Sequence, residues 1–234
     1  GLCDADKIRV VDHREIFAGY EQFLPTFNTR SIESMLWNIQ GLSDYFIYLN
    51  DDFFFNAEAK IEDFLENDSI VTYGHWKSCL SYKTKLKYRK FLNRHFNKPI
   101  QPGHVIGQML GADILGFKDF FEIHHYPHCV DRKILSEYLL SHPDLLETQI
   151  KYKFRSVEQL NPISLMNHLK IQKKEAVLKP DLTLAYLKNA ESLNDFVSAL
   201  DQDNIKYGCI QSLDQLTQAD AEQVKNAMLK KLEG

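Results

Sequence analysis

A short apolar run that ends directly in acidic residues constrains the fold of this chain most. Residues 45–49 read Tyr-Phe-Ile-Tyr-Leu, and Asn50, Asp51 and Asp52 follow at once. A nearly continuous apolar run of this length predicts a strand that is covered on both faces. Ligands of open α/β sheets bind beyond the carboxyl ends of strands, and adjacent carboxylates are costly to bury without a cation or donors. The stretch therefore favours a carboxylate site over a solvated acidic turn.

The segments around this run predict alternating helices and strands. Apolar residues at helical spacing predict a helix that begins at Ser31 and ends at Gly41. Further predicted elements are strands at 8–11, 70–74 and 207–212, a short helix within 57–68 and an amphipathic helix that opens at Thr217. We therefore expect an α/β fold with a mixed or mostly parallel sheet flanked by helices.

Composition narrows the class of protein. The chain has 234 residues, of which 44% are hydrophobic, and this suits a single domain. A net charge of -4 and a pI near 6.1 exclude a global basic field, so nucleic acid is not an expected partner. The sequence shows neither an apolar run of transmembrane length nor a signal peptide, which favours a cytoplasmic protein. The four cysteines lack CxxC spacing and indicate neither a zinc site nor a disulfide framework.

Residues 76–98 form the only basic segment in this acidic protein. Eight lysines and arginines alternate there with tyrosine and phenylalanine. A solvated helical face explains the pattern. Contact with a phosphate-bearing substrate or an anionic polymer explains it as well, and both interpretations stay open.

A second chemical cluster lies around His124, His125 and His128, with Asp131 and Arg132 close behind. The spacing does not match the helical HExxH metal motif, and a proline within the cluster predicts a loop just before a helix. Histidines in such a loop can bind anions or transfer protons near neutral pH, although surface histidines are the simpler explanation.

Two isolated side chains are weaker candidates. Arg155 could clamp a phosphate through two hydrogen bonds, although a lone arginine is usually a surface residue. His13 follows the predicted strand at 8–11 and is either a turn residue or a ligand.

Three strings resemble conserved regions of the Stealth family. Residues 24–53 contain Leu-Pro-Thr-Phe-Asn-Thr and later Phe-Ile-Tyr-Leu-Asn-Asp-Asp-Phe, and they look like its second region. Residues 125–132 together with Arg155 are similar to the third region, and residues 209–221 resemble the fourth. That family holds bacterial capsular polysaccharide phosphotransferases and the α/β subunit of the lysosomal-enzyme GlcNAc-1-phosphotransferase.

The chain departs from the family pattern in two places. The first region and the early part of the second, ahead of residue 7, are absent. We therefore expect residues 1–234 to be a single catalytic-type domain of nucleotide-sugar transferase-like fold, incomplete at its N-terminus, with a helical insertion at 171–206. Where many members have Asn-Asp in the fourth region, this chain has Gln211-Ser212, and Asp214 is a nearby substitute.

The resemblance implies an enzyme. It would transfer a hexose-1-phosphate, such as GlcNAc-1-phosphate, from a UDP-sugar to a hydroxyl of a glycan acceptor, forming capsular phosphodiester linkages and releasing UMP. We expect Asp51 and Asp52 to hold Mg²⁺ or Mn²⁺, His125 to be the general base and Arg155 to stabilise charge on the phosphate. The expected catalytic residues are His125, Arg155 and Asp52, and the expected substrate-binding residues are Thr26, Asn28, His13, His128 and Arg132.

Two alternatives stay open. A metal-dependent glycosyltransferase that releases UDP would also use an acidic pair after a strand. An inactive glycan-binding fragment that lacks the donor half would explain the absent first region. Because the sequence shows no secretion signal, we expect the protein in the cytoplasm, at the inner face of the bacterial inner membrane, in peripheral association with the capsule machinery.

Overall fold

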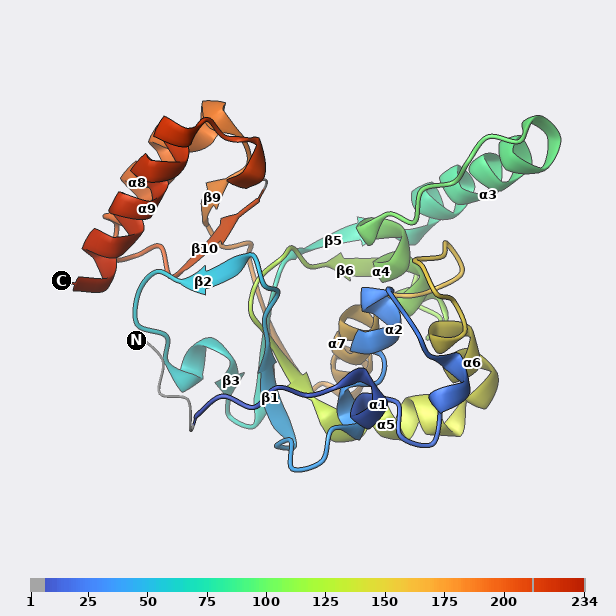
Figure 1. The fold of residues 1–234 in the computed structure, drawn as a ribbon. Helices are drawn as coiled ribbons and strands as arrows, with labels where there is room; N and C mark the ends of the chain where they lie inside the picture. Colours follow the sequence, from blue (N-terminus) through green and yellow to red (C-terminus); the bar gives the residue numbers. More distant parts are fainter. Residues whose placement is uncertain (1–6, 212, 234) are drawn as a thin grey trace. The chain divides into compact units, whose positions relative to one another are not determined.

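The computed structural model describes residues 7–211 and 213–233, and the chain divides into two compact units. Unit 1 comprises residues 1–46, 75–122 and 130–176, and unit 2 comprises residues 47–74, 123–129 and 177–234. Each unit takes three separate segments of the chain, so neither is one contiguous piece (Figure 1).

Unit 1 is mainly helical. Its elements are α1 (His13–Ile16), α2 (Thr29–Glu33), β5 (His75–Ser78), α3 (Cys79–Phe96), α4 (His104–Asp113), β6 (Asp119–Glu122), α5 (Arg132–Ser141), α6 (Pro143–Ile150) and α7 (Pro162–Lys173). Strands β5 and β6 pair antiparallel, and α4 packs against both β6 and α7. The apolar core under these elements includes Leu86, Ile106, Met109 and Phe120.

Unit 2 is built on two small sheets. Its elements are β2 (Phe53–Phe55), β3 (Leu65–Glu66), β4 (Ser69–Tyr73), β8 (Ala176–Lys179), β9 (Ala185–Leu187), α8 (Leu193–Leu200), β10 (Tyr207–Ile210) and α9 (Gln218–Glu233). One sheet has the order β2-β10-β9 and the other β3-β4-β8. Helices α8 and α9 pack against each other and supply Phe196, Leu200 and Val224 to an apolar cluster beside β9.

Two further strands run from one unit into the other. Strand β1 (Tyr45–Tyr48) pairs with β7 (His128–Asp131) in a two-stranded sheet. Side chains along β1 alternate between exposed and half-buried. The apolar sequence had predicted a strand covered on both faces, and this prediction is wrong.

The α/β prediction is confirmed at the level of class. The described strands form separate sheets of two or three strands, and no mostly parallel sheet occurs among them. One sheet is mixed, because β10 runs antiparallel to β2 and parallel to β9. The apolar runs had predicted one larger, mixed or mostly parallel sheet. They could not distinguish it from several small sheets, because strands buried in either arrangement have a similar sequence pattern.

Local predictions had mixed outcomes. The strands at 70–74 and 207–212 and the terminal helix are confirmed as β4, β10 and α9. The strand at 8–11 is wrong, because these residues form no ladder and Val10 is 90% exposed. The 57–68 segment holds a 3-10 turn (Ile61–Asp63) and β3 instead of an α-helix.

The helix that we expected from Ser31 to Gly41 begins earlier and is shorter. The side chain of Asn28, not Ser31, accepts a hydrogen bond from the first turn of α2. A 3-10 turn (Leu36–Asn38) follows, and Gly41 has the positive φ of 77° that suits glycine. Within the described part of the chain, no helix has both the length and the apolar character that a membrane span requires.

Candidate functional site

Unit 2 contains a cavity of about 400 Å³ at the end of the β2-β10-β9 sheet. This volume lies in the usual range for small-molecule sites. Three aromatic rings and several polar groups line it: Phe53, His124, His125, Tyr126, Asp181, Leu182, Leu184, Tyr186, Cys209 and Gln211. The cavity therefore combines an apolar wall with groups that can form hydrogen bonds or transfer protons.

Strand pairing brings acidic and amide side chains to this cavity. Cys209 pairs with Phe53 on one side and with Tyr186 on the other. Beyond these pairs, the backbone carbonyl of Asp52 accepts a hydrogen bond from Ile210 N at 2.8 Å. Residues that are distant in the sequence thus meet at one end of the sheet.

One oxygen of the Asp52 carboxylate accepts two long hydrogen bonds. Its Oδ2 lies 3.4 Å from Cys209 Sγ and 3.4 Å from Gln211 Nε2. Burial, followed by the negative charge of Asp52, raises the pKa of the Cys209 thiol to about 12. Cys209 is therefore a protonated hydrogen-bond donor at neutral pH and not a nucleophile.

The two adjacent acids retain free oxygen atoms. Asp51 is exposed and forms no hydrogen bond or ion pair with the described residues, and Oδ1 of Asp52 likewise has no such partner there. Magnesium and manganese prefer oxygen ligands, and Mg²⁺ is commonly held by one or two carboxylates together with substrate phosphates. The pair therefore fits a divalent cation that binds together with a diphosphate.

His125 is exposed, lines the cavity and has a polar neighbour from the acidic turn. Its Nδ1 is 3.3 Å from Nδ2 of Asn50, and its ring lies 6.3 Å from the ring of Phe53. An asparagine amide can face the imidazole with its nitrogen or, after a flip, with its oxygen. With the oxygen facing Nδ1–H, Nε2 is the unprotonated ring nitrogen that can accept a proton.

The other histidines of the loop have structural contacts. His128 Nε2 lies 3.1 Å from the carbonyl oxygen of His124, and desolvation lowers the pKa of His128 to about 4. His128 is therefore neutral near pH 7 and donates a hydrogen bond that closes the loop. This contact stabilises the loop that carries His125. The exposed ring of His125 is therefore the better candidate for proton transfer.

Tyr126 connects the histidine loop to residues that the sequence did not single out. Its hydroxyl donates to Leu182 O at 3.2 Å and accepts from Leu182 N at 3.1 Å. Asp181 Oδ1 is 3.4 Å from the same hydroxyl and 3.5 Å from His124 Nε2. Tyr186 donates to Gln211 Oε1 at 2.6 Å. No motif marks Asp181 or Tyr186, and only the tertiary structure shows that they line the cavity.

Among the residues that we expected to bind substrate, Thr26 and Asn28 are buried in unit 1. Asn28 donates to Tyr152 O and to Gln159 Oε1, and its own Oδ1 accepts from Arg30 N. The polar groups of Asn28 thus form hydrogen bonds within unit 1 that stabilise the fold. Thr26 Oγ1 has no partner among the described residues.

Arg155 donates through Nε and Nη2 to Thr29 Oγ1, at 2.9 and 2.7 Å. Arg155 is exposed and forms no ion pair with the described residues. Close by, Arg30 is buried and donates to Ser156 O, Gln159 O and Gly103 O. Burial, then the charge of Arg155, lowers the pKa of Arg30. The charge of Glu33 acts in the opposite direction and raises the pKa of Arg30. The exposed Arg155 is therefore the guanidinium that suits a phosphate here.

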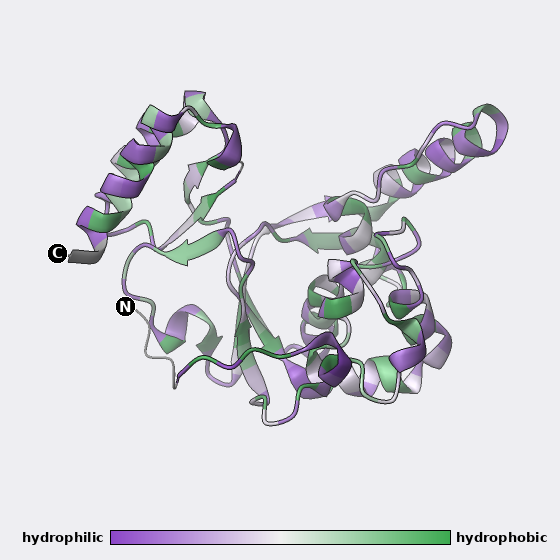
Figure 2. Ribbon diagram, in the orientation of Figure 1, coloured by the Kyte–Doolittle hydropathy of each residue, from purple (hydrophilic) through white to green (hydrophobic). Residues whose placement is uncertain are grey.

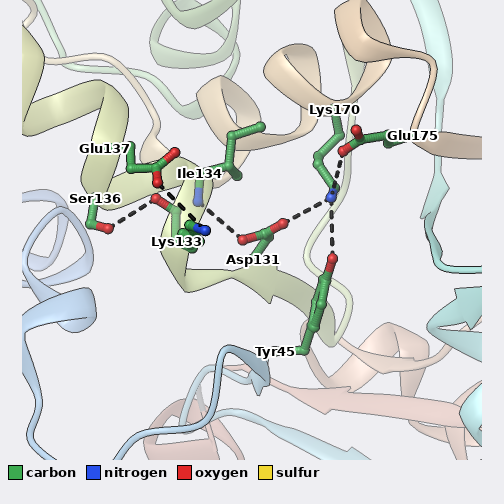
Figure 3. Close-up of polar contacts among 8 residues, drawn as sticks. All are labelled: Tyr45, Asp131, Lys133, Ile134, Ser136, Glu137, Lys170 and Glu175. Atoms are coloured by element: carbon green, nitrogen blue, oxygen red, sulfur yellow. Dashed lines mark hydrogen bonds and ion pairs between the residues drawn. The ribbon is translucent and has the colours of Figure 1, made fainter.

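Asp131 belongs to a buried network in unit 1 (Figure 3). Its Oδ1 accepts from Ile134 N at the start of α5, and its Oδ2 accepts from Lys170 Nζ at 2.8 Å. Lys170 donates also to Glu175 at 3.0 Å and to Tyr45 at 3.3 Å. All three hydrogens of the ammonium are thereby used, which is what a buried lysine requires.

Arg132 and His13 lie on the surface of unit 1. Arg132 is 3.4 Å from Asp44, and its backbone N–H donates to the Asp44 carbonyl. His13 is exposed at the first position of α1, and its ring has no hydrogen bond to the described residues. Ser212 lies outside the described residues, and Asp214 is exposed on a 3-10 turn (Leu213–Gln215).

The predicted site residues therefore fall into two groups. Asp51, Asp52, His125 and His128 belong to unit 2, and the cavity there gathers His125 with the neighbours of Asp52. Unit 1 holds His13, Thr26, Asn28, Arg132 and Arg155. Within it, only Asn28, Thr26 and Arg155 lie near one another, around the start of α2.

Comparison with known proteins shows what this chain is similar to. Residues 3–73 match the family model described as Stealth protein CR2, conserved region 2. This match contains the acidic turn and confirms the predicted second region. This part of the chain is therefore similar to the Stealth proteins. The assignments of residues 125–155 and 209–221 to further regions stay predictions.

Relatives with similar sequences come from several bacteria. An exopolysaccharide phosphotransferase of Streptomyces coelicolor is 26% identical over 181 residues, which are 77% of this chain and 29% of that protein. Capsular polysaccharide phosphotransferase LcbA of Aeromonas hydrophila is 41% identical over 80 residues, 34% of this chain and 22% of LcbA. The chain thus spans less than a third of the length of the first relatives that it matches.

Proposed function

We propose that this chain takes part in transferring a hexose-1-phosphate from a UDP-sugar to a hydroxyl of a glycan acceptor, in the synthesis of a capsular or extracellular polysaccharide. Similar proteins carry the name of polysaccharide phosphotransferases. The observation that supports the proposal best is the unit 2 cavity, where His125 lies beside the turn that carries Asp51 and Asp52.

In this proposal the acceptor oxygen attacks the phosphorus next to the sugar. A new oxygen–phosphorus bond forms, the bond from that phosphorus to the bridging oxygen of the diphosphate breaks, and UMP leaves. His125 Nε2 takes the proton of the acceptor hydroxyl, and Asn50 holds the ring through Nδ1. Because the carbon–oxygen bond of the sugar stays intact, its anomeric configuration is kept.

The acidic pair has a separate role. Asp51 and Asp52 would hold Mg²⁺ or Mn²⁺, and that cation would neutralise the negative charge of the diphosphate. The contacts of Cys209 and Gln211 with Oδ2 of Asp52 would orient the carboxylate, so that Oδ1 stays available.

The cavity walls suit the sugar. Tyr186 and Gln211 are hydrogen-bonded to each other and can exchange contacts with sugar hydroxyls, and Asp181 offers an acceptor. In unit 1, Arg155 is a separate candidate for binding a phosphate group, because its guanidinium keeps free donors and lacks a carboxylate partner among the described residues.

The first test measures the nucleotide that is released from UDP-GlcNAc in the presence of Mg²⁺ and a glycan acceptor. The chain is assayed alone and within the longer protein if its gene encodes more. UMP release that EDTA abolishes and Mn²⁺ restores supports the proposal. UDP release would assign a glycosyltransferase instead. Glycan binding without release of either nucleotide, in both forms, would assign a binding fragment.

The His125→Ala variant tests the general base. We expect kcat to fall by roughly 10²–10⁴-fold, because the acceptor hydroxyl loses its proton acceptor. The matched control is His142→Ala, which removes an exposed histidine that lies at the end of α5, in unit 1. Full activity of His125→Ala would contradict the assignment.

A further inference from the structure

Helix α3 has an unusual distribution of charge. Its residues, and those up to Lys98, include lysines and arginines but no aspartate or glutamate. The net charge of the whole chain is -4, so the positive field is local to this helix. In Figure 1, α3 extends away from α4 and α7 of unit 1.

One face of α3 packs against the rest of unit 1. Cys79 and Leu86 are buried in a cluster with Ile106 and Met109 of α4, and the ring of Tyr82 meets that of Phe120 edge-on. This face fixes the helix to the unit and determines which side chains point outward.

The opposite face carries a second apolar stripe. Leu80, Tyr88 and Phe91 are 71%, 61% and 51% exposed. With Thr84 and His95 they follow the spacing 80, 84, 88, 91 and 95, which places all five on one side of an α-helix. Figure 2 shows hydrophobic and hydrophilic residues alternating along α3. Large apolar side chains that solvent surrounds in this arrangement indicate an interaction surface.

Basic side chains flank the stripe, and ion pairs neutralise only some of them. Lys83 pairs with Asp113, and Lys90 pairs with Glu158. Lys85, Lys87 and Arg94 have no ion pair with any described residue. A hollow of about 530 Å³ beside the stripe is lined by Lys87, Lys90, Arg94 and His95, with Glu158 as its acidic member. The surface around the stripe is therefore positively charged.

We infer that α3 docks the protein onto an anionic membrane surface, with Leu80, Tyr88 and Phe91 in the interfacial layer and the flanking lysines and arginine on lipid headgroups. An apolar stripe between basic side chains is the pattern of interfacial helices. A soluble polyanion would pair with the charges but would leave the exposed leucine and rings in water. The combination of both features favours the membrane.

The test is co-sedimentation of the protein with vesicles of phosphatidylcholine mixed with phosphatidylglycerol, beside vesicles of phosphatidylcholine alone. We expect binding to the mixed vesicles that weakens with salt. The Lys87→Glu/Arg94→Glu variant should bind about tenfold more weakly or worse, because each basic residue contributes to attraction. The matched control Lys173→Glu/Lys188→Glu makes the same charge change at other exposed lysines and should bind normally.

Variants that replace an exposed apolar residue by serine distinguish membrane docking from electrostatic attraction of anions. Leu80→Ser should reduce vesicle binding severalfold, whereas Ile61→Ser, at a residue that is 74% exposed elsewhere, should not. Far-UV circular dichroism verifies that each variant is folded. If only the charge changes weaken binding, and a soluble polyphosphate competes fully with the vesicles, the surface serves a polyanion and the membrane inference is wrong. Absence of binding to mixed vesicles would also overturn it.

Discussion

At the scale of single residues, the structure separates groups that can act on a substrate from groups that hold the protein together. His125 and Asp51 are exposed and beside a cavity or turn, whereas Asn28 and Asp131 are buried and fully hydrogen-bonded. All four are polar residues in strings that resemble one family. The sequence alone could not divide them, because burial depends on contacts between distant segments.

The pair of Asp131 and Lys170 gives a prediction about pH. Burial tends to raise the pKa of Asp131, but the hydrogen bonds from Lys170 and from the Ile134 N–H outweigh it and lower the pKa. The stabilisation from this carboxylate is complete above the ordinary aspartate pKa near 3.9 and is lost as pH falls through the lowered value. The free energy of unfolding should therefore decline with acidification, and less steeply in Asp131→Asn.

Urea denaturation at successive pH values measures this difference. Glu137→Gln, at an exposed acid on α5, is the control and should keep the slope of the unaltered protein. Near neutral pH, Lys170→Met should lower the free energy of unfolding by about 3–5 kcal/mol, because it leaves a buried carboxylate unpaired. Equal slopes for Asp131→Asn and the unaltered protein would contradict the assignment.

At the scale of elements, the small β2-β10-β9 sheet positions the cavity. Gly208 of β10 lies opposite Phe54 of β2, and a Cβ atom at Gly208 would lie 2.1 Å from the Phe54 ring. Glycine is therefore required here for close packing and not for a special backbone angle. The ring of Phe54 in turn packs against the apolar cluster of α8 and α9.

Gly208→Ala tests this packing. The added methyl must displace the Phe54 ring, so the free energy of unfolding should fall by about 1–3 kcal/mol. The turnover should fall as well, because β2 and β10 carry the neighbours of Asp52 and Gln211. Thermal unfolding and the UMP assay measure both effects. Gly103→Ala is the control, since its Cβ would meet open space. An unchanged melting temperature for Gly208→Ala would contradict the prediction.

At the scale of the whole molecule, each unit has its own apolar core. The cluster of α8, α9 and β9 lies entirely within residues 185–224, and the cluster around α4 lies within residues 79–120. Neither cluster shares a residue with the other. We therefore expect each core to lose its structure separately when it is disrupted.

Val224→Asp puts a charge into the core of unit 2 and tests this independence. Peptides from 185–231 should lose protection in hydrogen–deuterium exchange, whereas peptides from 104–120 and 160–170 should keep theirs. The UMP release that we propose should disappear, because the cavity lies in unit 2. Leu229→Asp, at an exposed position of the same helix, is the control. Loss of protection in both sets of peptides would show that the two cores unfold together.

The sequence by itself determined the chemistry of the candidate site. The acidic turn at 50–52 and the histidine loop at 124–128 are local strings, so their composition and their family resemblance were visible without coordinates. Local hydrogen bonding and periodicity also determined elements such as α9 and β4. These features depend on residues that are near one another in the chain.

Only the tertiary structure decided which side chains meet. It brought Asp181, Tyr186 and Gln211 to the cavity of His125 and buried Asn28 and Asp131 in hydrogen-bonded networks. It also made the helix that was expected to start at Ser31 a shorter one that Asn28 caps. It also replaced the expected single mixed or mostly parallel sheet with several small sheets. The physical reason is the same in each case. Strand partners and burial are long-range contacts, and an apolar run has the same sequence pattern whichever segment covers it.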